Sequence, residues 1–183
     1  MRQTRTRIPA HVTVLALLVL VAVLTLPGCA ASGPEPVDAP GWVTHESVRF
    51  GFAVDVPADW PSTAYGETAP EEGFESPDAG IRLQIDGSEE DWLDIFGQAG
   101  TLTGYFDFDA HVSTEPFRTD SGLEGTVSLF EEGDEVRLVY SIDEKQLIQS
   151  RFLGAFARMD KERYERYKDV IDRIMKSLRQ TGT

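Results

Sequence analysis

Alternation of apolar and polar side chains is the sequence feature that most limits the fold of this chain. In the segment RFGFAVDV, residues 49–56, every second side chain is Phe or Val, and this period is typical of a strand with one buried face. Pro57 has no amide hydrogen to donate and is expected to end the strand. The same period recurs in four later sets: Ile81, Leu83 and Ile85; Phe106 and Phe108; Val127 and Leu129; and Val136, Leu138, Tyr140 and Ile142.

Two helices are predicted beside these strands. Ser88 precedes three acids, a pattern typical of a helix N-cap, and apolar residues follow at helical spacing: Trp92, Ile95, Phe96 and Ala99. A closing helix of about 20 residues is expected from Asp160, with the apolar stripe Tyr164, Tyr167, Ile171, Ile174, Met175 and Leu178. The predicted fold class is therefore α+β, an antiparallel β-sheet with helices packed on it.

The segments between these elements predict turns and one long loop. Residues 58–80 are rich in Pro, Gly and acids and are expected to form a loop with a short strand around Phe74. The tripeptide at residues 132–134, Glu-Gly-Asp, predicts a hairpin turn. A further strand is expected from about Gln146 to Phe156.

The first 28 residues are typical of a secretory signal peptide. Arg2, Arg5 and Arg7 precede an apolar run from Val12 to Leu26, and no acid lies before Cys29. The run has 15 residues, fewer than the roughly 20 that a membrane-spanning helix needs. We therefore expect a signal rather than a retained transmembrane helix.

The end of the apolar run, Leu26-Pro27-Gly28-Cys29, resembles the lipobox of bacterial lipoproteins, although Pro27 departs from the usual Ala or Ser. The resemblance implies signal cleavage between Gly28 and Cys29 and attachment of fatty acids, such as palmitate, to Cys29. Two or more acyl chains hold a protein stably on a membrane. The domain would then face outside the cytoplasmic membrane. The alternative is a buried free cysteine in an ordinary signal-like helix.

Cleavage would leave residues 29–183, which we divide into a flexible tether at 29–41 and a single domain at 42–183. The tether is small and Pro-rich, and the domain is long enough to bury a core without a disulfide or metal. The formal net charge of the chain is −14, and loss of the signal arginines makes it more negative. Such a domain is expected to repel nucleic acid.

Two segments resemble PsbP-like domains, a family named for the extrinsic oxygen-evolving protein of photosystem II. The first is the run from Phe50 to Trp60, in which an aromatic alternating strand is followed by Pro and then Trp. The second is the helix end Ile174-Met175-Lys176-Ser177-Leu178-Arg179. The resemblance covers roughly residues 42–180 and implies an α/β/α or α+β sandwich. It also implies a non-catalytic accessory or binding protein, and it supplies no ligand residue.

The sequence offers few residues for catalysis. His45 and His111 are the histidines beyond the signal, and both are expected at the surface or at a strand edge. His111 could be combined with Ser113 or Ser121 into a triad, but the chain has no Gly-x-Ser-x-Gly nucleophile motif. No catalytic residue is therefore predicted.

A metal site and a cofactor site are not predicted either. A zinc site would need several imidazole or thiolate ligands. Acids at 86–94 and 107–109 could supply oxygen ligands for calcium, but neither segment has EF-hand spacing. We interpret the first as a helix start and the second as the solvated side of a strand.

Aromatic residues near the Pro-rich loop could line a groove for a peptide, glycan or small molecule, or could belong to the core: Trp42, Trp60, Tyr65 and Phe74. Three hypotheses follow. The first is a non-enzymatic, lipid-anchored binding or accessory module for another envelope protein. The second is a lipoprotein that binds a small molecule or a cation such as calcium. The third is a hydrolase.

Overall fold

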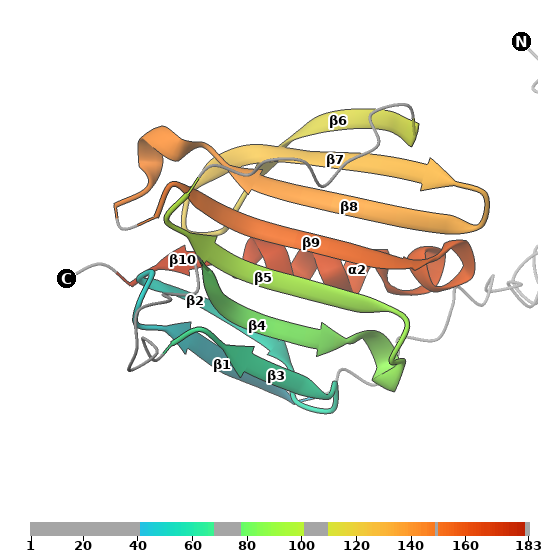
Figure 1. Cartoon of the computed structure of the whole chain (residues 1–183), viewed down its shortest axis with the longest axis horizontal. Helices are drawn as coiled ribbons and strands as arrows, with labels where there is room; N and C mark the ends of the chain where they lie inside the picture. The colour runs from blue at the N-terminus through green and yellow to red at the C-terminus, as the bar shows by residue number, and fades with distance from the viewer. Residues whose placement is uncertain (1–40, 68–77, 101–109, 149, 182–183) are drawn as a thin grey trace, which may run out of the picture. The chain divides into compact units, whose positions relative to one another are not determined.

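The computed structural model describes residues 41–67, 78–100, 110–148 and 150–181, and these form two antiparallel sheets and one α-helix (Figure 1). The larger sheet has the order β3 (Ser62–Tyr65), β4 (Asp78–Gln84), β5 (Trp92–Gln98), β9 (Phe152–Asp160), β8 (Glu135–Ile142), β7 (Glu124–Glu132) and β6 (His111–Arg118). The smaller sheet has the order β1 (Trp42–Ser47), β2 (Phe52–Pro57) and β10 (Arg179–Gln180). The helix is α2 (Lys161–Lys176).

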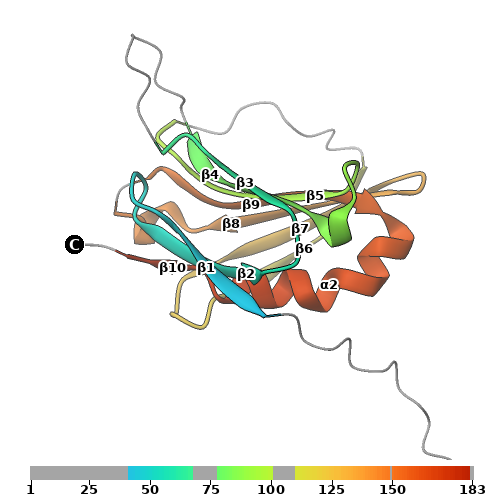
Figure 2. The ribbon, with the colours of Figure 1, turned by 90° about the horizontal axis from the view of Figure 1, so that it is seen from below.

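Helix α2 and the smaller sheet lie on the same side of the larger sheet (Figure 2). We call this side of the larger sheet its inner face and the opposite side its outer face. The core lies between these layers and is formed mainly by buried aliphatic side chains from β2, β4, β5, β8, β9 and α2. The fold is therefore α+β with an antiparallel sheet, as the sequence predicts.

Two of the strands predicted from alternation are confirmed as β4 and β8, although Ile85 lies in the 3₁₀ helix η1 (Ile85–Gly87) that follows β4. Ile81 and Leu83 of β4 are buried, as are Val136, Leu138, Tyr140 and Ile142 of β8. The predicted hairpin joins β7 to β8, with Glu132 paired to Glu135 and Gly133 at a φ of 60°. A positive φ is easily adopted by Gly, which explains the residue type at this turn.

The closing helix after Asp160 is confirmed, but it ends at Lys176, so Leu178 and Arg179 lie beyond the helix. Asp160 is its N-cap, and the Asp160 carboxylate accepts a hydrogen bond from the Arg163 amide at 2.7 Å. Ile171, Ile174 and Leu178 are fully buried together. At the other end, the Ser177 hydroxyl accepts a hydrogen bond from the Asp55 amide at 2.8 Å, so α2 is tied to β2 and is an integral part of the domain.

The predicted helix after Ser88 is wrong, because residues 92–98 form strand β5. Leu93 and Ile95 are buried on the inner face, while Phe96 is buried on the outer face. A strand buried on both faces has no period of two, so its apolar residues can match helical spacing. Gly97 lies within this strand. It allows Phe50 to approach β5, since a Cβ at Gly97 would lie 2.5 Å from the Phe50 Cβ.

Several strand boundaries differ from the predictions. The strand predicted at 49–56 is β2, which begins only at Phe52, because Gly51 turns the chain with a φ of 60°. Strand β3 lies inside the predicted loop. The strand predicted from Gln146 is β9, which begins at Phe152 after the 3₁₀ helix η3 (Glu144–Gln146). Phe74, Phe106 and Phe108 lie outside the described residues.

Candidate functional site

A groove lies between α2 and the part of the inner face that the helix leaves uncovered. Helix α2 packs mainly on β8, β9 and β2. The buried alanines of β9, Ala155 and Ala157, leave room for this approach because their side chains are small. Strands β7 and β6 extend beyond the helix, as Figure 1 shows for the far edge of the sheet. The inner face of these two strands therefore forms an open floor beside the helix.

Two rows of side chains cross the floor of the groove. Ser113 is paired with Leu129, and Leu129 with Leu138. In the next row, Glu115 is paired with Val127, and Val127 with Tyr140. The floor is apolar in the middle, on β7 and β8, and polar on edge strand β6. Val127 and Leu129 are only partly buried, so the groove exposes apolar surface that no described residue covers.

The helix side of the groove is formed by Tyr164, Lys168, Asp169 and Asp172. Tyr164, Lys168 and Asp172 are four residues apart and therefore lie on one side of the helix. The groove has a volume of about 260 Å³. A groove of this size accommodates one or a few side chains of a ligand. Sequence analysis assigned Tyr164 to the buried stripe, whereas in the structure it is half-exposed and forms a wall.

The arginines and the groove-lining acids of α2 lie on different sides of the helix. Arg163 lies 2.8 Å from Asp91, and the Arg173 guanidinium lies 4.1 Å from the centre of the Trp42 ring. The groove side instead carries Asp169 and Asp172, together with a lysine, Lys168, whose ammonium lies 2.6 Å from the Glu165 carboxylate. With Glu115 on the opposite side, the rim of the groove is net negative.

The two tyrosines of the groove lie in a negative, poorly solvated environment. Burial raises the pKa of Tyr140, and the charge of Asp172 raises it further. Burial also raises the pKa of Tyr164, and Glu115 is among the carboxylates that add to this effect. Both phenols therefore stay protonated at neutral pH. No described residue forms a hydrogen bond with either hydroxyl, although the Tyr140 ring packs edge-on against Phe117 with centroids 5.1 Å apart.

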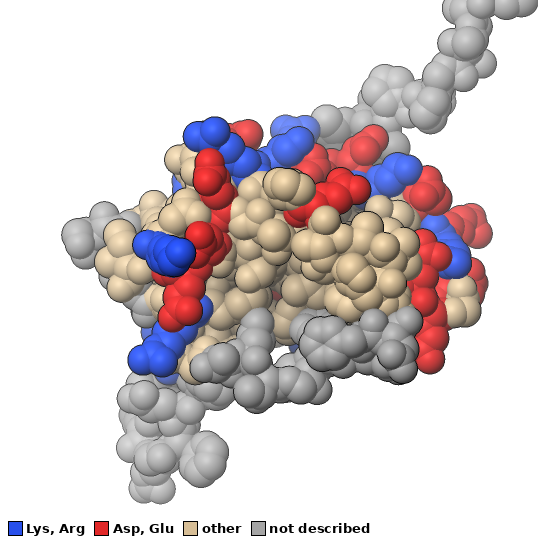
Figure 3. Space-filling model, turned by 90° about the horizontal axis from the view of Figure 1, so that it is seen from above, with Lys and Arg blue, Asp and Glu red and all other residues tan. Residues whose placement is uncertain are grey.

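The view from the β6 side shows the surroundings of the groove (Figure 3). Part of the surface along this edge of the sheet carries no charged side chain, and acidic and basic side chains lie above it and on both sides of it in this view. Strand β6 is an edge strand, but Pro116 and a register shift between His111 and Ser113 interrupt it. Such features discourage the pairing of an edge with another strand, so the groove and not the edge is the candidate site.

A second concavity, of about 610 Å³, lies on the outer face. Thr126 of β7 is paired with Ser141 of β8, and their small side chains line the hollow in the sheet surface. Phe152 and Arg151 line it as well, with carboxylates from Glu124, Asp143 and Glu144. These polar groups are mostly exposed, so the hollow is wetter than the groove.

Two of the acids between residues 86 and 94, Asp91 and Asp94, are engaged in contacts within the fold, whereas Glu89 and Glu90 are exposed. The buried carboxylate of Asp91 pairs with Arg163. Asp94 accepts hydrogen bonds from the Tyr65 hydroxyl at 2.7 Å and from Arg82 Nε at 3.1 Å. Within the described ranges, no group of three or more His, Cys, Asp or Glu residues is arranged to hold a metal ion. Asp107 and Asp109 lie outside these ranges.

The hydrolase triad that could be written from the sequence is not assembled. His111 is exposed on β6, and its Nε2 lies 2.8 Å from the Thr114 hydroxyl. Ser113 faces the groove floor. The Ser121 hydroxyl donates to the Leu178 carbonyl at 3.0 Å. Neither serine is hydrogen-bonded to the imidazole of His111, which contacts Thr114 instead.

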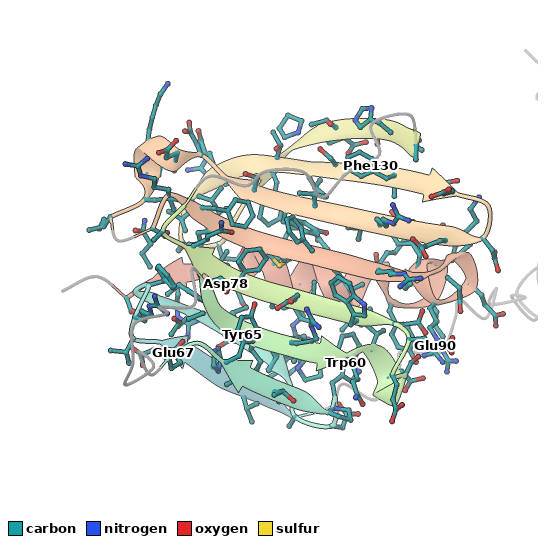
Figure 4. The ribbon with its side chains drawn as sticks, viewed as in Figure 1. Trp60, Tyr65, Glu67, Asp78, Glu90 and Phe130 are labelled. Carbon is teal, nitrogen blue, oxygen red and sulfur yellow. The ribbon has the colours of Figure 1, made fainter. Side chains whose placement is uncertain are left out.

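The aromatic residues that could have lined a groove have separate roles. Trp60 is buried and packs edge-on against Tyr167, with ring centroids 5.7 Å apart. Tyr65 lies on β3 near Asp78 of β4 (Figure 4), and burial raises the pKa of its phenol. Trp42 packs against Arg173. These three side chains pack within the fold and do not line a common groove. Phe74 lies outside the described residues.

His45 is half-buried on β1, an edge strand of the smaller sheet. Burial lowers the pKa of its imidazole, and the nearby Glu67 carboxylate opposes this effect. The Nε2 atom of His45 is buried and has no hydrogen-bond partner among the described residues. This environment favours the neutral imidazole.

Gly28 and Cys29, the predicted cleavage and lipidation residues, lie outside the described residues. None of the helices within the described ranges has the length and hydrophobicity to cross a membrane.

Comparison with known proteins finds similarity in structure but no match in sequence. No family model matches the sequence, and no curated protein matches it. The solution structure of cyanobacterial PsbP (CyanoP) from Synechocystis sp. PCC 6803 is similar to this chain at 12% sequence identity and a TM-score of 0.48. The similarity covers 83% of this chain and 98% of the cyanobacterial protein.

Proposed function

We propose that this protein is a non-enzymatic lipoprotein, anchored through Cys29, that acts as a binding or accessory module for another envelope protein. The groove between α2 and strands β6 to β8 is its binding surface. The observation that carries the proposal is the apolar, partly exposed floor at Val127 and Leu129, bordered by charged side chains on both sides. A groove of this kind buries apolar side chains of a partner while its rim sets specificity.

The sequence supports the cellular address in this proposal. The arginine-flanked apolar run and the lipobox-like Leu26-Pro27-Gly28-Cys29 favour export, cleavage before Cys29 and lipidation. The domain is then held on the outer side of the cytoplasmic membrane. The resemblance of residues 50–60 and 174–179 to PsbP-like domains is in keeping with an accessory role.

Metabolic labelling with a fatty-acid analogue tests the anchor. The wild-type protein should be labelled and should sediment with membranes, whereas Cys29→Ser should be unlabelled and retain its signal. Equal labelling of both proteins would remove lipidation from the proposal.

Site-specific photocrosslinking in intact cells tests the binding surface. A photoreactive phenylalanine analogue placed at Ser113, in the groove, should capture one discrete envelope protein. The matched control carries the analogue at Thr63, an exposed residue of β3 at the opposite edge of the sheet. The same pattern of products from both positions, or none from Ser113, would contradict the groove as the binding surface.

A small-molecule binding protein is the second candidate, and the outer hollow favours it. Its volume of about 610 Å³ lies within the range of roughly 300 to 1,000 Å³ that is usual for ligand pockets. The hydroxyls of Thr126 and Ser141 and the guanidinium of Arg151 can hold a polar ligand. Competition by a small molecule that protects Arg151 from chemical modification, without affecting crosslinking at Ser113, would favour this candidate.

A further inference from the structure

We propose that the groove binds an apolar peptide segment that carries lysine or arginine at its ends. This inference rests on the proposed function and names the chemistry of the partner. Three features of the groove lead to it: the apolar floor, carboxylates on both sides that form no ion pair with a described residue, and tyrosine hydroxyls with no hydrogen-bond partner among the described residues.

The floor determines the apolar part of the ligand. Val127, Leu129 and Leu138 lie side by side across β7 and β8, and the first two remain partly exposed. Aliphatic side chains placed over them would lose contact with water, which stabilises the complex by about 25 cal/mol for each Å² of apolar surface buried. A fully polar ligand gains nothing from this surface.

The rim determines the charge of the ligand. Glu115 lies on the β6 side of the groove and Asp169 on the α2 side, and neither carboxylate forms an ion pair with any described residue. Asp172 adds a third carboxylate, although its Oδ2 lies 2.7 Å from the Lys176 ammonium. The one groove lysine, Lys168, is paired with Glu165. A cationic group at each end of an apolar segment would therefore meet an available carboxylate on either side.

Helix α2 carries basic as well as acidic residues, so the negative charge beside the groove is a property of one side of the helix. Its arginines contact groups that do not line the groove: Arg163 contacts Asp91, Arg166 the ring of the adjacent Tyr167, and Arg173 the Trp42 ring. On the groove side, Asp169 has no ion-pair partner among the described residues and lies beside the apolar floor. An anionic segment would meet like charges at both ends, and like-charge contacts reduce affinity for the wrong partner.

The tyrosines provide polar contacts inside the groove. Tyr140 is 5% exposed, and no described residue forms a hydrogen bond with its hydroxyl or with that of Tyr164. Each hydroxyl can donate one hydrogen bond and accept others. A peptide backbone in the groove offers both amide donors and carbonyl acceptors, so these hydroxyls suit a peptide better than a purely hydrocarbon ligand.

Fluorescence anisotropy with designed peptides tests the inference. The mature lipoprotein is reconstituted in nanodiscs of neutral phosphatidylcholine, with empty nanodiscs as the blank. The first probe is a short fluorescein-labelled peptide of alternating leucine and valine with a lysine at each end. The second probe has glutamate in place of each lysine. The lysine peptide should bind at least about tenfold more tightly, and its affinity should fall as NaCl is raised from about 0.1 M to about 1 M.

Charge-neutralising variants assign the effect to the groove. Glu115→Gln combined with Asp169→Asn should weaken binding of the lysine peptide by about tenfold. The matched control, Asp59→Asn with Glu89→Gln, removes the same charge from exposed positions outside the groove and should change affinity by less than about twofold. Thermal melting of both variants checks that the fold is retained.

The outcomes separate this inference from the proposed function. Equal affinity for the two peptides, no binding of the lysine peptide, or equal effects of the two double variants would overturn the inference. If crosslinking at Ser113 still captured a discrete envelope protein, the proposed function would stand with a ligand of different charge. If neither experiment gave binding at the groove, both would be overturned.

Discussion

The Nε atom of Arg163 lies 2.8 Å from the Asp91 carboxylate and joins the β4–β5 connection to the first turn of α2. The same carboxylate accepts hydrogen bonds from the Ser88 hydroxyl at 2.6 Å and from the Asp160 amide at 3.1 Å. Asp91 is 8% exposed, so its charge is neutralised where water is largely excluded. The contact fixes where the closing helix begins on the sheet.

Replacing Asp91 should therefore destabilise the whole domain. Asp91→Ala leaves Arg163 and the Asp160 amide without their acceptor, and the expected cost is about 2 to 3 kcal/mol. Urea unfolding at neutral pH measures the change in midpoint at constant slope. Glu89→Gln, an exposed acid two residues away, is the control and should cost less than about 0.5 kcal/mol. Equal midpoints for the two variants would contradict a stabilising role for Asp91.

A second prediction concerns the outer face, where the Tyr65 hydroxyl donates to the buried carboxylate of Asp94 at 2.7 Å. Tyr65→Phe removes this donor and leaves the carboxylate to Arg82, so we expect a loss of about 1 to 3 kcal/mol in unfolding free energy. Thr63→Ala, exposed on the same strand, should be nearly neutral. A Tyr65→Phe protein as stable as Thr63→Ala would show that Arg82 alone satisfies Asp94.

The apolar stripe of α2 leads to a third prediction. Ile174 is fully buried, and truncation of such a residue to Ala typically costs about 2 to 5 kcal/mol. Ile174→Ala should lower the denaturant midpoint markedly. Lys176→Ala removes only a solvent-exposed pair with Asp172 and should cost about 0.5 kcal/mol or less. If the two variants unfolded at the same midpoint, α2 would not be packed on the sheet as described.

His45 should make stability depend on mildly acidic pH. Its pKa is lowered from the ordinary value of 6.5, chiefly by burial, so the folded state binds a proton less readily than the unfolded state. The resulting stability is fully present above pH 6.5 and is lost as the pH falls through the lowered pKa. His45→Gln should therefore lose less stability than wild type between neutral pH and about pH 5.

Denaturant midpoints at the two pH values measure this difference. His111→Gln, which removes an exposed histidine from β6, is the matched control. The prediction is contradicted if wild type and His45→Gln lose the same stability on acidification.

The sequence alone is sufficient for elements whose burial is one-sided. The alternation at residues 136–142 identifies β8, and the stripe Tyr167, Ile171 and Ile174 identifies α2, because each side chain's exposure follows directly from the repeat of its own element. The N-cap at Asp160 and the turn at Gly133 are likewise local, since capping and positive φ depend on neighbouring backbone. The lipobox-like segment at Gly28 and Cys29 is also read from sequence alone.

The tertiary structure decided the rest. Strand β5 is buried on both faces, so its sequence has apolar residues on both sides and no period of two. Its pairing with β4 and β9 and the packing of Phe50 against Gly97 distinguish it from a helix. The groove has the same origin: Glu115, Tyr140 and Asp169 are far apart in sequence and meet only where α2 stops short of β7. The sequence by itself determined which side chains are apolar and how often they repeat. Which part of the inner face stays uncovered depends on where α2 packs on the larger sheet. That position depends on contacts between residues far apart in sequence, so a local repeat cannot predict it.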